Sequence, residues 1–163
     1  MSITIRPAQA QDAQGMAEVL NEIIQIGGTT AYTDPVTPDY LMGRMSEATD
    51  ASAWHVAIDD SGDCVGFQWI TTAAYLPPEA CEIATFAKVG RTGLGIGTKL
   101  FAATKAAAIS LGYSWINANI RSDNDSGLAY YTAKGFKDYD RQIGIELANG
   151  HVVDKTLKRF DLS

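Results

Sequence analysis

The chain has 163 residues, of which 46% are hydrophobic and 20% charged, so its length and composition predict a single soluble domain over residues 1–163. It lacks the apolar run of roughly 18 to 20 residues that a membrane helix needs, and its first residues do not follow the pattern of a secretory signal. The chain has only two cysteines, two histidines and no paired-cysteine motif, so we expect neither a disulfide framework nor a metal site. The few cysteines also predict a reducing, cytoplasmic location.

Charge is unevenly distributed along this acidic chain. A net charge of −6 makes nucleic acid and anionic membranes poor partners. Residues 83–122 contain five basic and no acidic side chains, whereas the rest of the chain is strongly acidic. The basic segment is either a place where a small anionic ligand binds or an ordinary group of solvated charges.

Hydrophobic periodicity and turn residues predict the elements in chain order. Strands are expected over residues 2–6, 54–58, 64–72, 81–89 and 115–120, followed by a hairpin of 136–147 and 151–162 with a type I′ turn at Asn149-Gly150. Helices are expected from an Asp12 N-cap to Gly27-Gly28, from Thr37-Pro38 to Met45, over about 15 residues ending near Leu111, and from 122–126 to Gly135. The third helix is expected to bury Leu100, Ala103, Ala107 and Leu111. This order predicts an α/β domain with a mixed sheet.

The central feature is a glycine-rich segment between a predicted strand and a predicted helix, Arg91-Thr92-Gly93-Leu94-Gly95-Ile96-Gly97-Thr98-Lys99. Glycines at alternate positions let an anion approach the main-chain N–H groups, and the helix that follows points its positive dipole end at the same place. Phosphate is the ligand that suits this arrangement. The dinucleotide pattern G-x-G-x-x-G fails because Thr98 or Leu100 occupies its third glycine position. The P-loop pattern fails because Thr98 precedes Lys99.

The segment instead resembles the R/Q-x-x-G-x-G/A loop of the GNAT N-acetyltransferases, which cradles the pyrophosphate of acetyl-CoA. Gly95-Ile96-Gly97 supplies the second half of that pattern. Downstream, Asn124, Tyr131, Gly135 and Phe136 match the family's N-x-x-(A/S)-x-x-x-Y-x-x-x-G-F segment. The opening TIRPAQAQDAQGM is similar to the family's first strand and helix, so the resemblance covers most of the chain.

A finer resemblance points to the phosphinothricin (methionine sulfoximine) acetyltransferase branch, which acetylates small amino-acid-like amines. It rests on TTAYTDPVTPDYLM and on Glu82 placed shortly before Phe86-Ala87. The family resemblance implies the GNAT fold, a single mixed and mostly antiparallel sheet of about seven strands flanked by about four helices. It also implies acetyl-CoA as cosubstrate, no metal, and a possible homodimer.

The resemblance further implies which residues hold acetyl-CoA. They are the end of the predicted fourth strand, the glycine-rich loop and two downstream positions: Phe86, Ala87, Lys88, Val89, Arg91, Thr92, Gly93, Leu94, Gly95, Ile96, Gly97, Thr98, Asn124 and Tyr131. Thr92 stands where the family has Arg or Gln, so that side-chain contact is either lost or taken over by Arg91. The Ala87 N–H is expected to stabilise the oxyanion, unless it is an ordinary ladder group. Asn124 either contacts the pantetheine, caps a helix, or does both.

Acetyl transfer to an amine also needs a base and an acid. Glu82 is the only acid in the strand before the loop; it is the candidate base, with a pKa raised by burial, or else a solvent-facing charge. Tyr131 takes the family's position for the acid that protonates the CoA thiolate, or else it is a core aromatic residue. Tyr131→Phe is expected to cut turnover and Tyr130→Phe is not. Tyr32 and Tyr75, on predicted loops, either line the acceptor pocket or are packing residues.

We interpret the sequence as an acetyl-CoA-dependent N-acetyltransferase that acts on a primary amine of a small, amino-acid-like molecule by direct attack. The alternative is a non-catalytic acyl-CoA-binding or regulatory module on the same fold, which would need the glycine loop but not Glu82 or Tyr131. A Ser-His-Asp hydrolase is not supported because the chain lacks G-x-S-x-G.

Overall fold

The computed structural model describes residues 2–91 and 94–162, and its strands form a seven-stranded sheet in the order β1-β2-β3-β4-β5-β7-β6. The elements are β1 (Thr4–Pro7), the 3-10 turn η1 (Ala10–Asp12), α1 (Ala13–Ile26), α2 (Pro38–Met45), β2 (Ala53–Ile58), β3 (Cys64–Thr71), β4 (Ala80–Ala87), α3 (Ile96–Ser110), β5 (Trp115–Arg121), α4 (Asp125–Lys134), β6 (Lys137–Glu146) and β7 (Val152–Asp161). Only the β4–β5 pair is parallel among the described neighbours. The predicted α/β class and mixed, mostly antiparallel sheet are confirmed.

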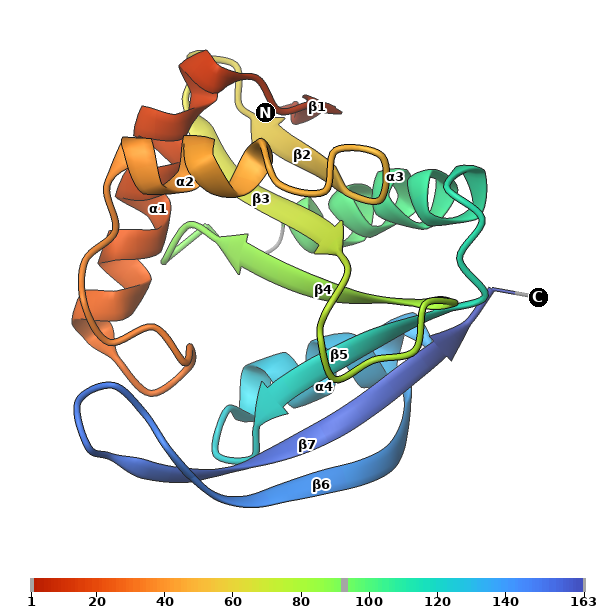
Figure 1. The fold of residues 1–163 in the computed structure, drawn as a ribbon. Helices are drawn as coiled ribbons and strands as arrows, with labels where there is room; N and C mark the ends of the chain where they lie inside the picture. Colours follow the sequence, from red (N-terminus) through yellow and green to blue (C-terminus); the bar gives the residue numbers. More distant parts are fainter. Residues whose placement is uncertain (1, 92–93, 163) are drawn as a thin grey trace.

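Helices cover both faces of this sheet (Figure 1). Side chains of α1 and α2 pack on one face with Trp54, Phe67, Trp69 and Phe86. Side chains of α3 and α4 pack on the other face with residues such as Ile83 and Ile116. Because successive side chains of a strand point to opposite faces, each central strand contributes to both cores.

The neighbouring parallel strands β4 and β5 separate part-way along their length. They pair from Ala80 opposite Trp115 to Ile83 opposite Ala118, and the register stops there. Figure 1 shows the two strands close at their N-terminal ends and apart at their C-terminal ends. The last four residues of β4 therefore have a ladder partner only on the β3 side.

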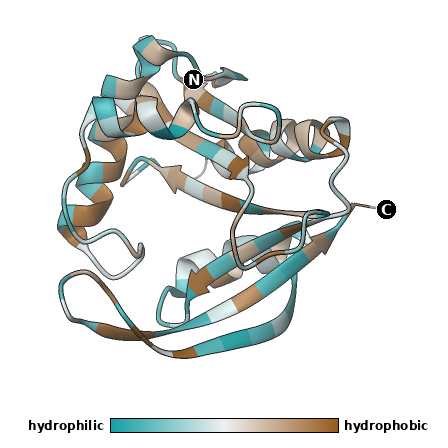
Figure 2. Cartoon of the chain, in the orientation of Figure 1, coloured by the Kyte–Doolittle hydropathy of each residue, from teal (hydrophilic) through white to brown (hydrophobic). Residues whose placement is uncertain are grey.

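The final hairpin forms the far edge of the sheet. Most β6 side chains are exposed, and the strand is largely hydrophilic in Figure 2. The predicted type I′ turn is wrong, because that turn requires positive φ at both central residues and only Gly150, not Asn149, has it. The N–H of Gly150 donates to Leu147 O, and the N–H of Leu147 donates to His151 O, which closes a three-residue loop.

Two helix details also differ from expectation. Asp12 precedes α1 but does not cap it, because its carboxylate accepts hydrogen bonds from the Gln9 N–H (2.7 Å) and from Arg6. The buried face of α3 consists of Ile96, Leu100, Phe101, Thr104 and Ala108. Of the predicted stripe, Leu100 is buried, Ala103 and Ala107 are half-buried, and Leu111 is exposed. The larger Phe101 turns inward instead and packs against Phe136. No helix in the described ranges is long and apolar enough to cross a membrane.

Candidate active site

The glycine-rich segment leads directly into the N-terminus of α3. Gly95 is the N-cap residue and adopts φ +69°, a left-handed conformation that glycine tolerates best. The Lys99 N–H donates to Gly95 O (3.0 Å) as the first bond of the helix. The N–H groups of Ile96, Gly97 and Thr98 precede that bond and have no intrahelical acceptor, so they are available to an anion.

Glycines allow this first turn of α3 to pack closely. A Cβ at Gly97 would lie 2.6 Å from Cε1 of Tyr130, and a Cβ at Gly66 on β3 would lie 2.8 Å from Cγ2 of Ile96. Neither separation is compatible with a side chain unless its neighbours move. The tight packing fixes the helix N-terminus between β3 and α4.

The predicted loop contacts are only partly described. Thr92 and Gly93 lie outside the described residues. The guanidinium of Arg91, which the sequence offered as a substitute contact for the pyrophosphate, forms an ion pair with Asp59 (3.2 Å) in the β2–β3 turn. Leu94, half-buried, packs with the hydrophobic cluster under α3.

The backbone of β4 divides the predicted pantetheine-binding residues into two sets. The Lys88 N–H donates to Val65 O (2.9 Å), so Lys88 and Phe86 direct their backbone groups toward β3. The cofactor contacts expected of these two residues stay a prediction. Ala87 lies at the intervening position, so its N–H points away from β3 and toward the gap where β5 has separated. Val89, beyond the strand end, is 45% exposed.

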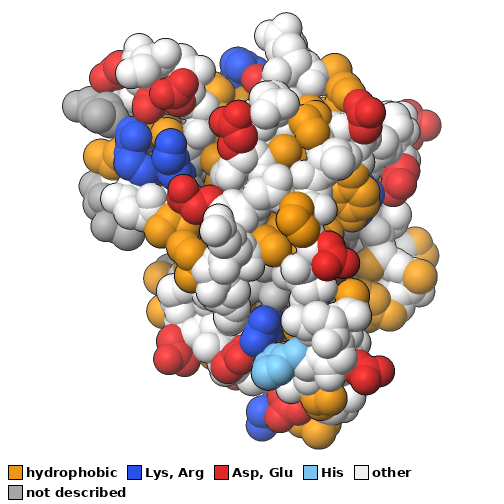
Figure 3. Space-filling view, turned by 90° about the vertical axis from the view of Figure 1, so that its left-hand side faces the viewer, with side chains coloured by type: hydrophobic (Ala, Val, Ile, Leu, Met, Phe, Trp, Pro, Cys, Tyr) orange, Lys and Arg blue, Asp and Glu red, His pale blue; other side chains and the backbone are white. Residues whose placement is uncertain are grey.

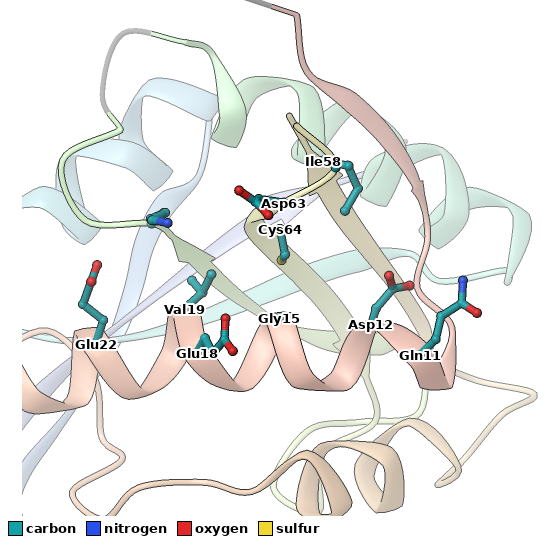
Figure 4. A pocket seen from close by; sticks show the side chains of 11 residues that line it. Gln11, Asp12, Gly15, Glu18, Val19, Glu22, Ile58, Asp63 and Cys64 are labelled. Carbon is teal, nitrogen blue, oxygen red and sulfur yellow. The ribbon is translucent and has the colours of Figure 1, made fainter. Parts of the chain in front are cut away.

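The side chain of Lys88 also lies away from the glycine loop. It lines a hollow of about 450 Å³ between α1 and the start of β3. Figure 4 shows Glu18 and Glu22 of α1 on one side of this hollow and Asp63 on the other. The hollow is predominantly acidic, so it does not extend the predicted anion site.

Glu82 lies at the centre of a polar cluster on the α1/α2 face of the sheet. Its carboxylate accepts hydrogen bonds from Tyr75 Oη and from Asn117 Nδ2 (3.4 Å). Asn117 is fully buried and accepts from Tyr139 Oη, while Asn119 Nδ2 donates to Tyr75 Oη (3.2 Å). Burial raises the pKa of Glu82, an effect only partly offset by these hydrogen bonds and by the charges of Lys155 and Arg44. The direction is the one expected of a base.

Tyr131 lies on the opposite face, beneath the open stretch of β4. Its ring is buried and contacts Phe136, and its Oη is 2.8 Å from Thr85 Oγ1. Burial raises the pKa of Tyr131, whereas the hydrogen bond with Thr85 lowers it. The adjacent Tyr130 is not an inert control for Tyr131, because its Oη donates to Gly97 O (2.8 Å) at the start of α3.

Tyr32 belongs to a separate group of aromatic and basic side chains beside Glu82. Its hydroxyl is 3.0 Å from Tyr40 Oη, and Arg44 Nη1 of α2 donates to both hydroxyls at 3.3 Å. The Arg44 guanidinium lies 5.5 Å from the centre of the Trp69 ring. Tyr32 and Tyr40 also line a hollow of about 330 Å³ that reaches Ala148 in the β6–β7 loop. Tyr75 thus contacts Glu82 directly, whereas Tyr32 contacts Arg44, whose charge acts on Glu82.

Asn124 has the structural role that the sequence offered for it. It is the N-cap of α4, and its Oδ1 accepts from the Gly127 N–H (3.0 Å). Its Nδ2 donates to Thr29 O (3.0 Å) in the loop between α1 and α2. In this structure both ends of the amide are occupied by protein contacts.

Comparison with known proteins gives three similar acetyltransferases. A Bacillus subtilis (strain 168) protein, YwnH, described provisionally as a phosphinothricin acetyltransferase, is 27% identical over 98% of this chain and 95% of its own. The phosphinothricin N-acetyltransferase of Streptomyces viridochromogenes is 23% identical over 98% of this chain and 89% of its own. A crystal structure of a GNAT superfamily phosphinothricin acetyltransferase from Sinorhizobium meliloti, in complex with AcCoA, matches with a TM-score of 0.86. It is 23% identical and covers 100% of this chain and 90% of that one. No protein-family model matches the chain.

Over nearly its whole length the chain is thus similar to phosphinothricin acetyltransferases, and it shares the fold of solved GNAT acetyltransferases. These similarities agree with the GNAT resemblance expected from the sequence. On the face of this GNAT chain seen in Figure 3, Lys and Arg side chains occur in small groups with acidic side chains nearby. Among the described residues, no group of three or more His, Cys, Asp or Glu side chains could hold a metal ion.

Four polar residues of this acetyltransferase site were missed by sequence reasoning: Arg44, Gln68, Thr85 and Asn117. Gln68 lies in a largely apolar strand and Asn117 is flanked by apolar residues, and both are fully buried. That signal could have identified them, because a buried polar side chain requires hydrogen-bond partners. Arg44 had no such signal, since a basic residue at the end of a short helix is common.

Proposed function

We propose that the protein transfers the acetyl group of acetyl-CoA to the primary amine of a small, amino-acid-like acceptor by direct attack. The observation that carries the proposal is the open stretch of β4. It begins next to Glu82, contains the outward-facing Ala87 N–H, and lies over Tyr131. The candidate base, oxyanion donor and acid therefore surround the place where β4 leaves β5: Glu82 and Tyr131 lie on opposite faces, and the Ala87 N–H lies on the unpaired edge.

The described residues suit acetyl-CoA as the cosubstrate. The N–H groups at the start of α3 offer a site for the diphosphate; a Cβ at Gly95 would meet nothing within 4 Å, whereas Gly97 makes room for the Tyr130 ring. The unpaired edge of β4 offers main-chain groups to an extended chain, as a further strand would. These features support the N-terminus of α3, rather than the acidic hollow beside α1, as the coenzyme site.

Each candidate residue has a defined task in the transfer. The Glu82 carboxylate accepts a proton from the ammonium of the acceptor, which gives the neutral amine that attacks the thioester carbon. The Ala87 N–H donates to the carbonyl oxygen as negative charge develops on it. When the carbon–sulfur bond breaks, Tyr131 gives its phenolic proton to the leaving sulfur. The amide nitrogen loses its remaining extra proton to water, so the reaction releases one proton overall after Glu82 and Tyr131 return to their starting states.

The charges beside Glu82 support an acceptor that also carries an acidic group. Arg44 and Lys155 are close enough to lower the pKa of Glu82, and the Arg44 side chain remains partly exposed. A guanidinium is well suited to bind a carboxylate or a phosphinate. An amino acid could therefore present its amine to Glu82 and its acid group to Arg44.

The proposal is tested by measuring thiol release from acetyl-CoA with a panel of acceptors. The panel contains methionine sulfoximine, phosphinothricin, free amino acids, polyamines and aminoglycosides. We expect acceptor-dependent release with the amino-acid-like members and an acetylated amine in the product mixture. Turnover confined to polyamines or aminoglycosides would contradict the acceptor class, and no turnover with any amine would contradict the activity.

A further inference from the structure

A chain of hydrogen bonds connects Tyr131 to the start of α3 through the interior of the sheet. Tyr131 Oη lies 2.8 Å from Thr85 Oγ1, and Gln68 Nε2 donates to that same oxygen at 2.8 Å. Gln68 Nε2 also donates to Tyr130 Oη (3.1 Å), which in turn donates to Gly97 O (2.8 Å). Gln68 is fully buried and Tyr131 is 7% exposed, so water has little access to the centre of the chain.

The carbonyl of Gly97 fixes the direction of these bonds. A carbonyl oxygen can only accept a hydrogen bond, so Tyr130 donates its single hydroxyl hydrogen to Gly97 O. Tyr130 can then only accept from Gln68, which places the amide nitrogen rather than the amide oxygen of Gln68 toward it. The second hydrogen of that nitrogen points to Thr85.

The contacts of Thr85 bear on the direction of its hydrogen bond with Tyr131. Its hydroxyl oxygen accepts from Gln68 and lies 2.8 Å from Tyr131 Oη, and the Tyr130 hydroxyl also interacts with it. Tyr130 Oη already accepts from Gln68, which favours Tyr131 Oη as the acceptor of the Thr85 hydrogen. In that arrangement the hydrogen of Tyr131 has no acceptor among the described residues. A buried hydroxyl hydrogen without an acceptor is unfavourable unless a ligand supplies one.

We propose that Thr85 and Gln68 are positioning residues that direct the Tyr131 proton toward the leaving sulfur. This inference rests on the proposed acetyl transfer. Tyr131 gives its proton to the sulfur, an O–H bond breaks as an S–H bond forms, and the negative charge moves to the phenolic oxygen. Thr85 already donates to that oxygen, so it stabilises the phenolate without reorienting. Tyr130 cannot replace Tyr131, because its hydrogen is bound to Gly97.

A neutron crystal structure of the deuterated protein would show the direction of each hydrogen bond in this chain, whether or not the protein is active. We expect deuterium on Thr85 Oγ1 aimed at Tyr131 Oη, and deuterium on Gln68 Nε2 aimed at Thr85 and Tyr130. Deuterium on Tyr131 aimed at Thr85 would overturn the proposal. An inactive protein with the expected deuterium positions would contradict the proposed function but not the inferred hydrogen-bond directions.

A double-mutant cycle tests whether Thr85 acts through Tyr131. Thr85→Val should lower kcat about tenfold with the KM for acetyl-CoA unchanged, and Thr85→Ser should recover most of that loss because it restores the hydroxyl. In a Tyr131→Phe background, Thr85→Val should have no further effect on kcat. A second tenfold fall in that background would mean that Thr85 acts on the fold alone, and would overturn the inference.

Thr104 provides the matched control. It is a buried threonine of α3, and its hydroxyl has no partner among the described residues. Thr104→Val should leave kcat unchanged in both backgrounds. Should Thr85→Val fail to fold, Gln68→Met is used in the same cycle, with a loss of kcat that again disappears in the Tyr131→Phe background.

Discussion

The side chains of Glu82, in strand β4, and Tyr131, in α4, lie on opposite faces of the sheet. Glu82 shares the face of Phe86, which α1 and α2 cover, whereas Tyr131 reaches Thr85 from the α4 side. The odd spacing between Glu82 and Thr85 produces this separation, because side chains alternate along a strand. A base and an acid so placed can deliver an amine to one side of a thioester and a proton to the other.

Glu82→Gln is expected to lower kcat/KM by about 10² to 10⁴ near neutral pH. Glu82 must be ionised to act as a base, and burial raises its pKa, so wild-type activity falls as the pH drops through that raised value. The variant has no such group and depends on the free amine alone. Its deficit should therefore shrink as the pH approaches the pKa of the acceptor amine, which full pH–rate profiles would show.

Glu79→Gln is the matched control for Glu82, because Glu79 is an exposed acid only three residues away. Its profile should coincide with that of the wild type. A Glu82→Gln profile that is parallel to the wild type at every pH would assign Glu82 a structural role only.

Substitution of the two adjacent tyrosines should separate kcat from KM. Tyr131→Phe removes the acid and should lower kcat by about 10², with little change in the KM for acetyl-CoA. Tyr130→Phe removes the hydrogen bond to Gly97 O, so it should raise the KM for acetyl-CoA and largely preserve kcat. Steady-state kinetics at saturating acceptor give both numbers. Equal losses of kcat in the two variants would be inconsistent with Tyr131 as the acid.

The fold was predictable because its signals are local. Thr37 caps α2, Pro38 begins it, and Gly135 ends α4. Each of these depends on backbone geometry that a few neighbouring residues decide. The inward face of α3 was not predictable in this way, because contacts with Phe136 and Phe160 decide that Phe101 turns inward.

The candidate site shows the same division. Spacing indicated Glu82, Tyr131 and the glycine loop, since each belongs to a pattern within one segment. One partner of Glu82, Asn117, is 35 residues away in the chain, and Tyr139, which donates to Asn117, is further still. Strand pairing brings them together, and no short-range pattern encodes which side chains will face one another across a sheet.

Gly97→Ala should weaken coenzyme binding by about tenfold, measured as the Kd for CoA by calorimetry. The added Cβ would meet the ring of Tyr130 at 2.6 Å, so either the ring or the first turn of α3 must move. Gly43→Ala in α2 is the comparison, because its Cβ would meet nothing within 4 Å. That change should raise stability by about 0.5–1 kcal/mol and leave the Kd unaltered. An unchanged Kd in Gly97→Ala would place the diphosphate away from this turn.

Arg44→Gln should raise the KM for an acceptor with a free carboxylate by about tenfold or more, because a charge-assisted hydrogen bond is lost. The same acceptor as its carboxamide has no negative charge, so its KM should change little between wild type and variant. Arg141→Gln, on the exposed strand β6, is the matched removal of a guanidinium and should affect neither KM. The comparison also checks the fold of the variant, since Arg44 contacts Tyr32 and Tyr40 as well. An equal rise in KM for carboxylate and carboxamide would show that Arg44 shapes the pocket through those tyrosines and does not bind the acid group.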